Sequence, residues 1–112
     1  MAKRILITSD TLGKAETELG AILMRSFLVS LAHEENAPAA VMLSNDGVRL
    51  ACEGSEALDE LRLLAEAGVA ITACGTCLKY LGLQDKLFVG TEGTMSGLVA
   101  AVCGPDEIVT IG

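Results

Sequence analysis

Aromatic residues are scarce in this sequence. It contains no tryptophan, and its aromatic residues are Phe27, Tyr80 and Phe88, although 51% of all residues are hydrophobic. The core must therefore consist of aliphatic side chains and methionine, a composition typical of a parallel sheet covered on both faces. A flavin site, which usually uses aromatic side chains to stack on the ring, is disfavoured for the same reason.

Basic residues and long apolar runs are also few. Eight Lys and Arg oppose 15 Asp and Glu, which gives a formal charge of −7. Such a chain is repelled by nucleic acid and by anionic membranes, so we expect neither as a partner. The apolar run 5–7 after Lys3 and Arg4 is far too short for a signal peptide or a membrane span. We therefore expect a cytoplasmic protein.

The chain alternates between strand and helix patterns and shows no linker or internal repeat, which indicates a single domain over residues 1–112. We predict strands at 4–8, 39–43, 69–73, 87–89 and 107–111. We predict helices at 16–32, at 55–67 with Ser55 as its cap, between Cys74 and Gly82, and at 95–102. Residues 48–52 read as a short extended piece and 90–94 as a loop. This alternation predicts a three-layer α/β/α fold with a five-stranded, mostly parallel sheet.

The first predicted helix has an unusually broad apolar stripe. Leucines 19, 23 and 31 recur with Phe27 at four-residue spacing, and Ile22, Met24 and Leu28 widen the stripe on both sides. One face of a sheet cannot cover so many apolar residues. Either a neighbouring subunit covers part of the stripe or the helix is unusually deep, and we favour the subunit.

A Cys-x-x-Cys motif, Cys74 to Cys77, follows the third predicted strand. Cys74 takes the place of a helix N-cap, so both sulfurs are expected at a helix N-terminus, where free N–H groups favour a thiolate. The three-residue spacing brings the two thiols to one side of the first turn. Each can then resolve a species formed on the other.

Loops after parallel strands open on one edge of the sheet, where ligands bind. We therefore expect Asp10 and Asn45 to meet the two cysteines there. The backbone at Gly75 and the hydroxyls of Thr76 and Thr94 are candidate donors to an anionic sulfur. Lys14 could attract an anionic partner or simply be solvated.

The two cysteines of the motif could also be unreactive or bind a metal. The pair could be buried and inert, since free cysteine is among the most buried residue types. It could instead be half of a zinc site, which would need Cys52, Cys103 or His33 to complete four ligands. We expect Cys103 to lie in the core, Cys52 to pack or to reach the rim, and His33 to be solvated at a helix end. No resident metal or cofactor is expected.

A flavodoxin-like protein is the main rival interpretation of the first loop, because residues 8–13 precede a helix as a phosphate loop would. The sequence contains no Gly-x-Gly-x-x-Gly and no P-loop pattern, so nucleotide binding has no further support.

Four stretches resemble the C-terminal half of YedF-type selenium-metabolism proteins, in the DsrE/DsrF-like superfamily of sulfur-relay proteins. They are TSDTLGK at 8–14, ELG at 18–20 with LMRSFL at 23–28, GVRLACEGS at 47–55, and CGTCLKYLGL at 74–83. The resemblance implies a five-stranded parallel sheet in three layers and assembly into dimers, trimers or hexamers. It also implies a persulfide-type adduct on Cys74, while Cys77 belongs to the Cys-Gly-x-Cys pattern of the YedF-type branch.

The chain departs from this family in two places. The sulfur-carrier-like N-terminal domain is missing, so we expect the donor to be a separate protein. Thr94-Met95-Ser96 stands where the family has Asn-Met-Tyr, so the roles of that Asn and Tyr do not carry over.

The sequence therefore predicts a thiol-based sulfur or selenium carrier, a possible sulfurtransferase. Cys74 would hold the persulfide, Cys77 would resolve it, and the partners would be a sulfur donor or acceptor protein and further copies of the chain. Two alternatives stay open. The chain could be a non-catalytic subunit of a sulfur-relay complex or a dithiol redox protein.

Overall fold

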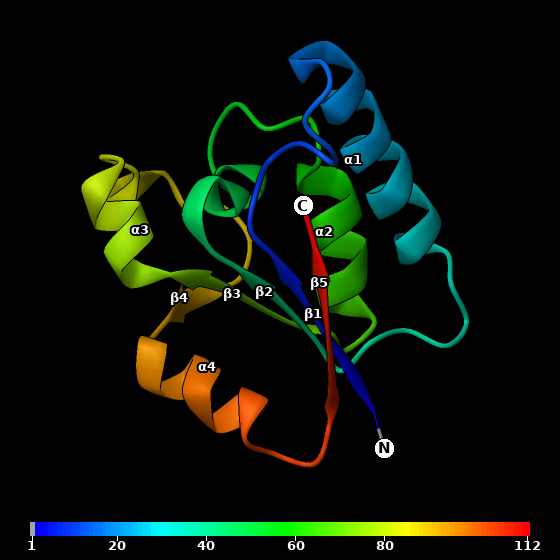
Figure 1. Cartoon of the computed structure of the whole chain (residues 1–112), viewed down its shortest axis with the longest axis vertical. Coiled ribbons are helices and arrows are strands. Elements are labelled where there is room, and N and C mark those ends of the chain that lie inside the picture. Colours follow the sequence, from blue (N-terminus) through cyan, green and yellow to red (C-terminus); the bar gives the residue numbers. More distant parts are fainter. Residues whose placement is uncertain (1) are drawn as a thin grey trace.

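The computed structural model describes residues 2–112, which form a parallel sheet with helices on both faces (Figure 1). Its strands are β1 (Lys3–Ile7), β2 (Ala40–Leu43), β3 (Ala70–Cys74), β4 (Thr91–Gly93) and β5 (Glu107–Ile111). Its α-helices are α1 (Thr17–Ala32), α2 (Leu58–Glu66), α3 (Gly75–Tyr80) and α4 (Met95–Val102), and its 3-10 helices are η1 (Asn45–Ala51) and η2 (Gln84–Lys86). The predicted three-layer α/β fold is confirmed.

The strand order β4-β3-β2-β1-β5 explains how the helices divide between the two faces. From β1 to β3 the chain moves steadily toward one edge, and right-handed crossovers place α1 and α2 on the same face. From β4 the chain returns across the sheet to β5, beside β1. That reversed step places α4 alone on the opposite face (Figure 1).

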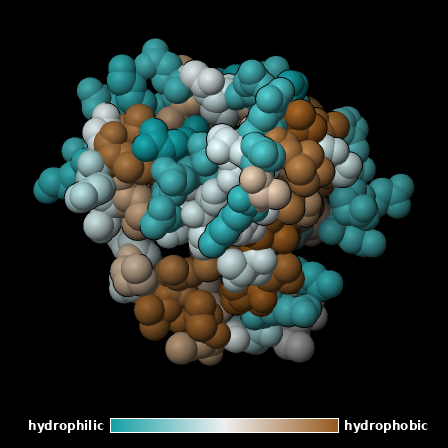
Figure 2. Space-filling view, turned by 45° about the horizontal axis from the view of Figure 1, so that its top comes forward, coloured by the Kyte–Doolittle hydropathy of each residue, from teal (hydrophilic) through white to brown (hydrophobic). Residues whose placement is uncertain are grey.

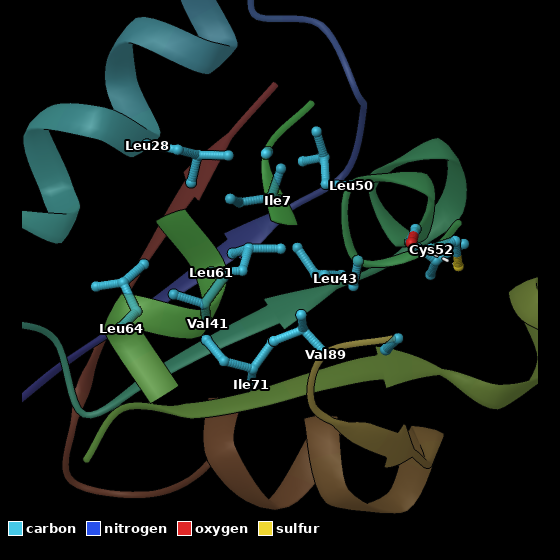
Figure 3. Packing of buried hydrophobic residues seen from close by; sticks show 14 of the residues in the cluster. Ile7, Leu28, Val41, Leu43, Leu50, Cys52, Leu61, Leu64, Ile71 and Val89 are labelled. Carbon is cyan, nitrogen blue, oxygen red and sulfur yellow. Dashed lines mark hydrogen bonds between the residues drawn. The ribbon is translucent and has the colours of Figure 1, made fainter. Parts of the chain in front are cut away.

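The hydrophobic core lies between the sheet and the α1–α2 layer (Figure 3). Alternate strand residues such as Ile7, Val41 and Ile71 point into it and meet Leu28 of α1 and Leu61 of α2. These five side chains are each at most 4% exposed. Removing this much aliphatic surface from water is the main force that holds the two layers together.

The α4 layer is packed much less tightly. Among the described residues of α4, not one is buried, and Met95, Val99 and Val102 are more than half exposed. Figure 2 shows hydrophobic side chains gathered on the surface in this region and along α1. One eight-residue helix lies on this face of a five-stranded sheet, so it covers that face only in part.

Helix α1 confirms that the apolar stripe is too broad for one sheet face. Gly20, Met24 and Leu28 are its buried residues. Four large apolar side chains of the stripe and its flanks stay exposed: Leu19, Ile22, Leu23 and Val29. The helix is therefore not unusually deep within this chain, and an apolar surface is left uncovered.

The extended piece expected at 48–52 is wrong, because residues Asn45–Ala51 form the 3-10 helix η1. The turn closes where the N–H of Gly47 donates to the carbonyl of Ser44 at 2.9 Å. Gly47 also packs directly against the carbonyl of Ile7, where any Cβ would collide. Packing of the glycine on β1 thus fixes a helical turn where an extended piece was expected.

The strand expected at 87–89 is also wrong, and the fourth strand is β4, inside the expected loop 90–94. Leu87 forms only an isolated antiparallel bridge with Cys52, and the Phe88 N–H donates to the Ala51 carbonyl at 2.9 Å. Gly90, at φ +83°, then turns the chain into register with β3. A short edge strand of small and polar residues carries almost no sequence signal.

Ser55 does not cap α2 directly. Its hydroxyl accepts the Ala57 N–H at 3.0 Å, and α2 begins at Leu58 after Ala57 as N-cap. The helix therefore starts three residues later than its predicted cap.

Helices of the described chain do not meet the requirements for crossing a bilayer. Even the 16-residue α1 is shorter than the ~20 residues that a membrane span needs.

Candidate functional site

The two cysteines of the motif lie at the turn from β3 into α3, as predicted. Cys74 is the last residue of β3 and the N-cap of α3, and the helix ends at Tyr80 with Leu81 as its C-cap. Gly82 follows at φ +72°, the left-handed conformation that commonly closes a helix. All four cysteines lie in the described part of the chain and are free thiols.

Strand alternation decides which way Cys74 faces. Ile71 and Ala73 are buried in the core toward α1 and α2, so Thr72 and Cys74 face the α4 side. There the half-buried Cys74 lines one end of a hollow of about 270 Å³ between α4 and the sheet. The thiol therefore lies in a largely apolar surrounding that is open to small molecules.

Asn45 reaches the second cysteine through its backbone. Its N–H donates to Cys77 Sγ at 3.1 Å. Asn45 is the described non-glycine residue with a positive φ, at +53°, a conformation that Asn tolerates better than most residues. The structure thus brings the backbone of Asn45 into the site. The side-chain oxygen of Asn45 does not contact the sulfur but accepts the N–H of Asp46 at 3.0 Å.

The pKa of the Cys74 thiol is raised above its ordinary value, mainly because burial disfavours the thiolate. The hydrogen bond with the Cys77 thiol raises it too, whereas the N–H groups of Cys77 and Thr76 lower it. The expectation that the helix N-terminus makes Cys74 acidic is therefore wrong. Loss of solvent outweighs the few N–H groups of a helix that has only six residues.

The predicted donors at Gly75, Thr76 and Thr94 make different contacts in the structure. Thr76 contributes its backbone N–H to Cys74, while its side chain is exposed. Thr94 lines the same hollow as Cys74, but its hydroxyl caps α4 by accepting the Gly97 N–H at 3.1 Å. Gly75 lies beneath the carboxylate of Glu92, where a Cβ would come within 2.6 Å of Glu92 Oε2.

Glu92 is the residue of this site that sequence reasoning missed. It lies on β4 opposite Ala73, so its side chain reaches the first turn of α3, and it also lines the hollow. The error in the position of β4 hid it. Had 91–93 been recognised as a strand parallel to β3, the register would have placed Glu92 beside the motif.

Asp10 lies along a different hollow, of about 340 Å³, together with Arg25 and Arg49. The loop that carries Asp10 is held by a hydrogen bond within the loop, in which the Thr11 N–H donates to Ser9 Oγ at 3.1 Å. The structure therefore separates Asp10 from the pocket that Cys74 lines. Lys14 is exposed on the loop that follows.

The remaining cysteines and the histidine lie apart from the motif. Cys52 is buried, donates its S–H to the Val48 carbonyl at 3.2 Å, and has a pKa raised by that burial. Cys103 is exposed, so its predicted core position is wrong, because α4 packs too loosely to bury its end. His33 lies at the end of α1 with Nδ1 2.9 Å from the Val29 carbonyl oxygen. Residues 2–112 hold no cluster of three or more side chains suited to a metal ion.

Comparison with known proteins supports the fold. No family model matches the sequence, and no curated protein matches it. Among solved structures, a protein of unknown function from Methanobacterium thermoautotrophicum, MTH1491, has a TM-score of 0.71 and 22% identity over 96% of both chains. The ychN protein from E. coli has a TM-score of 0.70 and 21% identity over 99% of this chain and all of its own.

A third structure, the conserved protein of unknown function BT1422 from Bacteroides thetaiotaomicron, has a TM-score of 0.68 and 13% identity, and the match covers 98% of this chain and 95% of the other. The likeness therefore extends over whole chains. These proteins and this chain share one α/β fold.

Proposed function

We propose that this chain is a thiol-based carrier of sulfane sulfur, in which Cys74 accepts the sulfur and Cys77 assists. The observation that carries the proposal is the pairing of the two thiols, with the Asn45 N–H on Cys77 Sγ at 3.1 Å. The N–H fixes the position of the Cys77 sulfur beside Cys74. Cys77 is then placed to attack the inner sulfur of a persulfide on Cys74.

The transfer step balances without a cofactor. Cys74 Sγ loses its proton to solvent and attacks the terminal sulfur of a donor persulfide, R–S–SH. The S–S bond of the donor breaks, R–S⁻ leaves, and Cys74 holds a persulfide. An acceptor thiolate then removes the terminal sulfur. Alternatively, the Cys77 thiolate attacks the inner sulfur, which forms the Cys74–Cys77 disulfide and releases HS⁻.

The resemblance to YedF-type proteins supports the same assignment, because the carrier position of the sulfur-relay family matches Cys74. It also leaves selenium as an alternative cargo, since Cys74 could take the terminal selenium of a donor R–S–SeH by the same exchange, with R–S⁻ leaving.

The experiment is mass spectrometry of the protein after incubation with inorganic polysulfide. We expect the mass of one or more sulfur atoms on the peptide that contains Cys74, and loss of that adduct in Cys74→Ser. Cys77→Ser should keep its adduct longer, because the resolving thiol is gone. Cys103→Ser is the matched control. Equal loading of Cys52 or Cys103 would contradict the assignment.

A dithiol redox protein is the second candidate, favoured by the hydrogen bond between Cys74 and Cys77. The two functions separate when loaded protein meets an acceptor thiol. A carrier yields an acceptor persulfide and a reduced Cys74, whereas a redox protein yields its own disulfide and HS⁻ and leaves the acceptor thiol unchanged. A reduction potential measured against glutathione then places the pair on the redox scale.

Self-assembly belongs to the same proposal. Leu19, Ile22 and Leu23 of α1 are each at least 42% exposed, and a second copy of the chain would cover them. Sedimentation should show an oligomer. Ile22→Glu should dissociate it, whereas Arg62→Glu, at an exposed position of α2, should leave it intact. A monomer at every concentration would contradict this part of the proposal.

A further inference from the structure

The hollow beside Cys74 has the character of a ligand site. Its floor is the sheet face, with Leu6 and Met42, and its roof is α4, with Leu98 and Ala101. Cys74 lies at its carboxyl end, half-buried and facing it. Apolar atoms make up most of the lining, which is typical of small-molecule sites that grip the organic part of a ligand.

The charged residues that line the hollow disfavour an anionic ligand. Among the described residues that line it, Arg4 and Glu92 carry charge. The Arg4 guanidinium is already paired, with Nε 2.9 Å from Asp106 Oδ2. The Glu92 carboxylate lies against Gly75, the residue after Cys74, so the charge nearest the reactive end is negative, which disfavours carboxylated or sulfonated thiols.

The size of the hollow limits what fits. A volume of 270 Å³ corresponds to about nine water molecules, and so to an organic group with a similar number of non-hydrogen atoms. A benzyl-sized group satisfies this limit, and a peptide does not.

We propose that the hollow binds the organic group of a small, neutral, apolar thiol that exchanges sulfur with Cys74. The inference rests on the proposed carrier function and names its substrate class. In the exchange, R–S–SH lies with R between α4 and the sheet. The Cys74 sulfur loses its proton to solvent and bonds to the terminal sulfur, the S–S bond of the donor breaks, and R–S⁻ leaves with the electron pair and is protonated by solvent.

Methanethiosulfonates with different organic groups test the hollow separately from sulfur transfer. Each forms a mixed disulfide with a cysteine thiolate and releases methanesulfinate, so only the organic group varies. The benzyl, trimethylammonioethyl and sulfonatoethyl reagents would be compared by peptide mass spectrometry. Exposed Cys103 supplies the rate of an open thiol in the same molecule. Relative to Cys103, we expect Cys74 to prefer benzyl over sulfonatoethyl by about tenfold or more, as an apolar contact in a pocket allows.

Two neighbouring alanines on α4 give a matched pair of variants. Ala101 lines the hollow, whereas Ala100 is exposed on the helix. Ala101→Phe should fill the hollow and remove the benzyl preference, and Ala100→Phe should leave it unchanged. If Ala101→Phe does not fold, benzyl alcohol tests the same point in the wild-type protein, since it should slow the labelling of Cys74 and leave Cys103 unaffected.

Each outcome bears on the proposal. Equal preferences at Cys74 and Cys103, or a benzyl preference that survives both Ala101→Phe and benzyl alcohol, would overturn it. A Cys74 that loses reactivity as the protein concentration rises would also overturn it, because a second copy would then fill the hollow. Loading of Cys74 by inorganic polysulfide does not depend on the hollow. If polysulfide does not load Cys74, the carrier function is contradicted, and not only the ligand site.

Discussion

The backbone N–H of Asn45 lies 3.1 Å from Cys77 Sγ, although 32 positions separate the two residues in the sequence. The loop that carries Asn45 is attached to β1, because the Ser44 N–H donates to the carbonyl of Ile7 at 3.0 Å. Two strands thus position the donor, and α3, which follows β3, carries the sulfur. The contact depends on the packing of the sheet and not on the motif alone.

The left-handed backbone of Asn45 gives the first prediction. Asn45→Val should lower the free energy of unfolding by about 1–2 kcal/mol, because a branched side chain is strained at φ +53°. It should also slow alkylation of Cys77, since relaxing the strain moves the N–H away from the sulfur. Asn45→Gly keeps both the conformation and the N–H, so its stability and reactivity should stay close to wild type. Urea denaturation and iodoacetamide kinetics measure the two effects, and equal behaviour of both variants would refute the constraint.

The second prediction concerns the pair of thiols. Cys77→Ala should lower the pKa of Cys74, because the hydrogen bond and the charge of Cys77 that raise it are both removed. Burial remains, so part of the upward shift should persist. The rate of Cys74 alkylation against pH measures the pKa, with Cys103→Ala as the control. An unchanged or higher pKa in Cys77→Ala would mean that the two thiols do not interact.

The raised pKa of Cys74 makes stability depend on alkaline pH. Below the pKa of the unfolded thiol, about 8.5, both states hold the proton and this group adds no dependence. Above it the unfolded state ionises first and binds fewer protons, so the free energy of unfolding falls as the pH rises, until the native thiol also ionises.

Cys74→Ser removes this contribution, so its unfolding free energy should fall less steeply than that of wild type above about pH 8.5. Denaturation in urea from pH 7 to pH 10 measures the slopes. Cys52, whose pKa is raised by burial in the same sense, is present in both proteins and does not affect the difference. Parallel curves would show that Cys74 is not buried in solution.

The fourth prediction tests the position of Glu92 over Gly75. Gly75→Ala should be less favourable in wild type than in a Glu92→Ala background, because its new Cβ would meet the Glu92 side chain within 2.6–2.9 Å. Without that side chain, alanine should stabilise α3 through its higher helix propensity. The double-mutant cycle should therefore give a coupling of about 0.5–1 kcal/mol. A coupling of zero would place Glu92 elsewhere.

The motif region shows how much of the site a local pattern can predict. Cys74 as N-cap, Gly82 in the left-handed position and α4 over 95–102 were all expected and are observed, since each depends on neighbours in the chain. The ionisation of Cys74 was predicted in the wrong direction. A helix N-terminus is visible in a sequence, but the loss of solvent around a sulfur is not.

The sequence by itself determined the layered α/β fold, because apolar periodicity and turn residues act over a few positions. It also placed the two thiols at the end of β3. Only the tertiary structure decided that Asn45 offers its backbone to Cys77, that Glu92 reaches Gly75 from an edge strand with almost no sequence signal, and that Asp10 lies along another hollow. These relations arise between segments far apart in the chain, where strand order and register fix the distances.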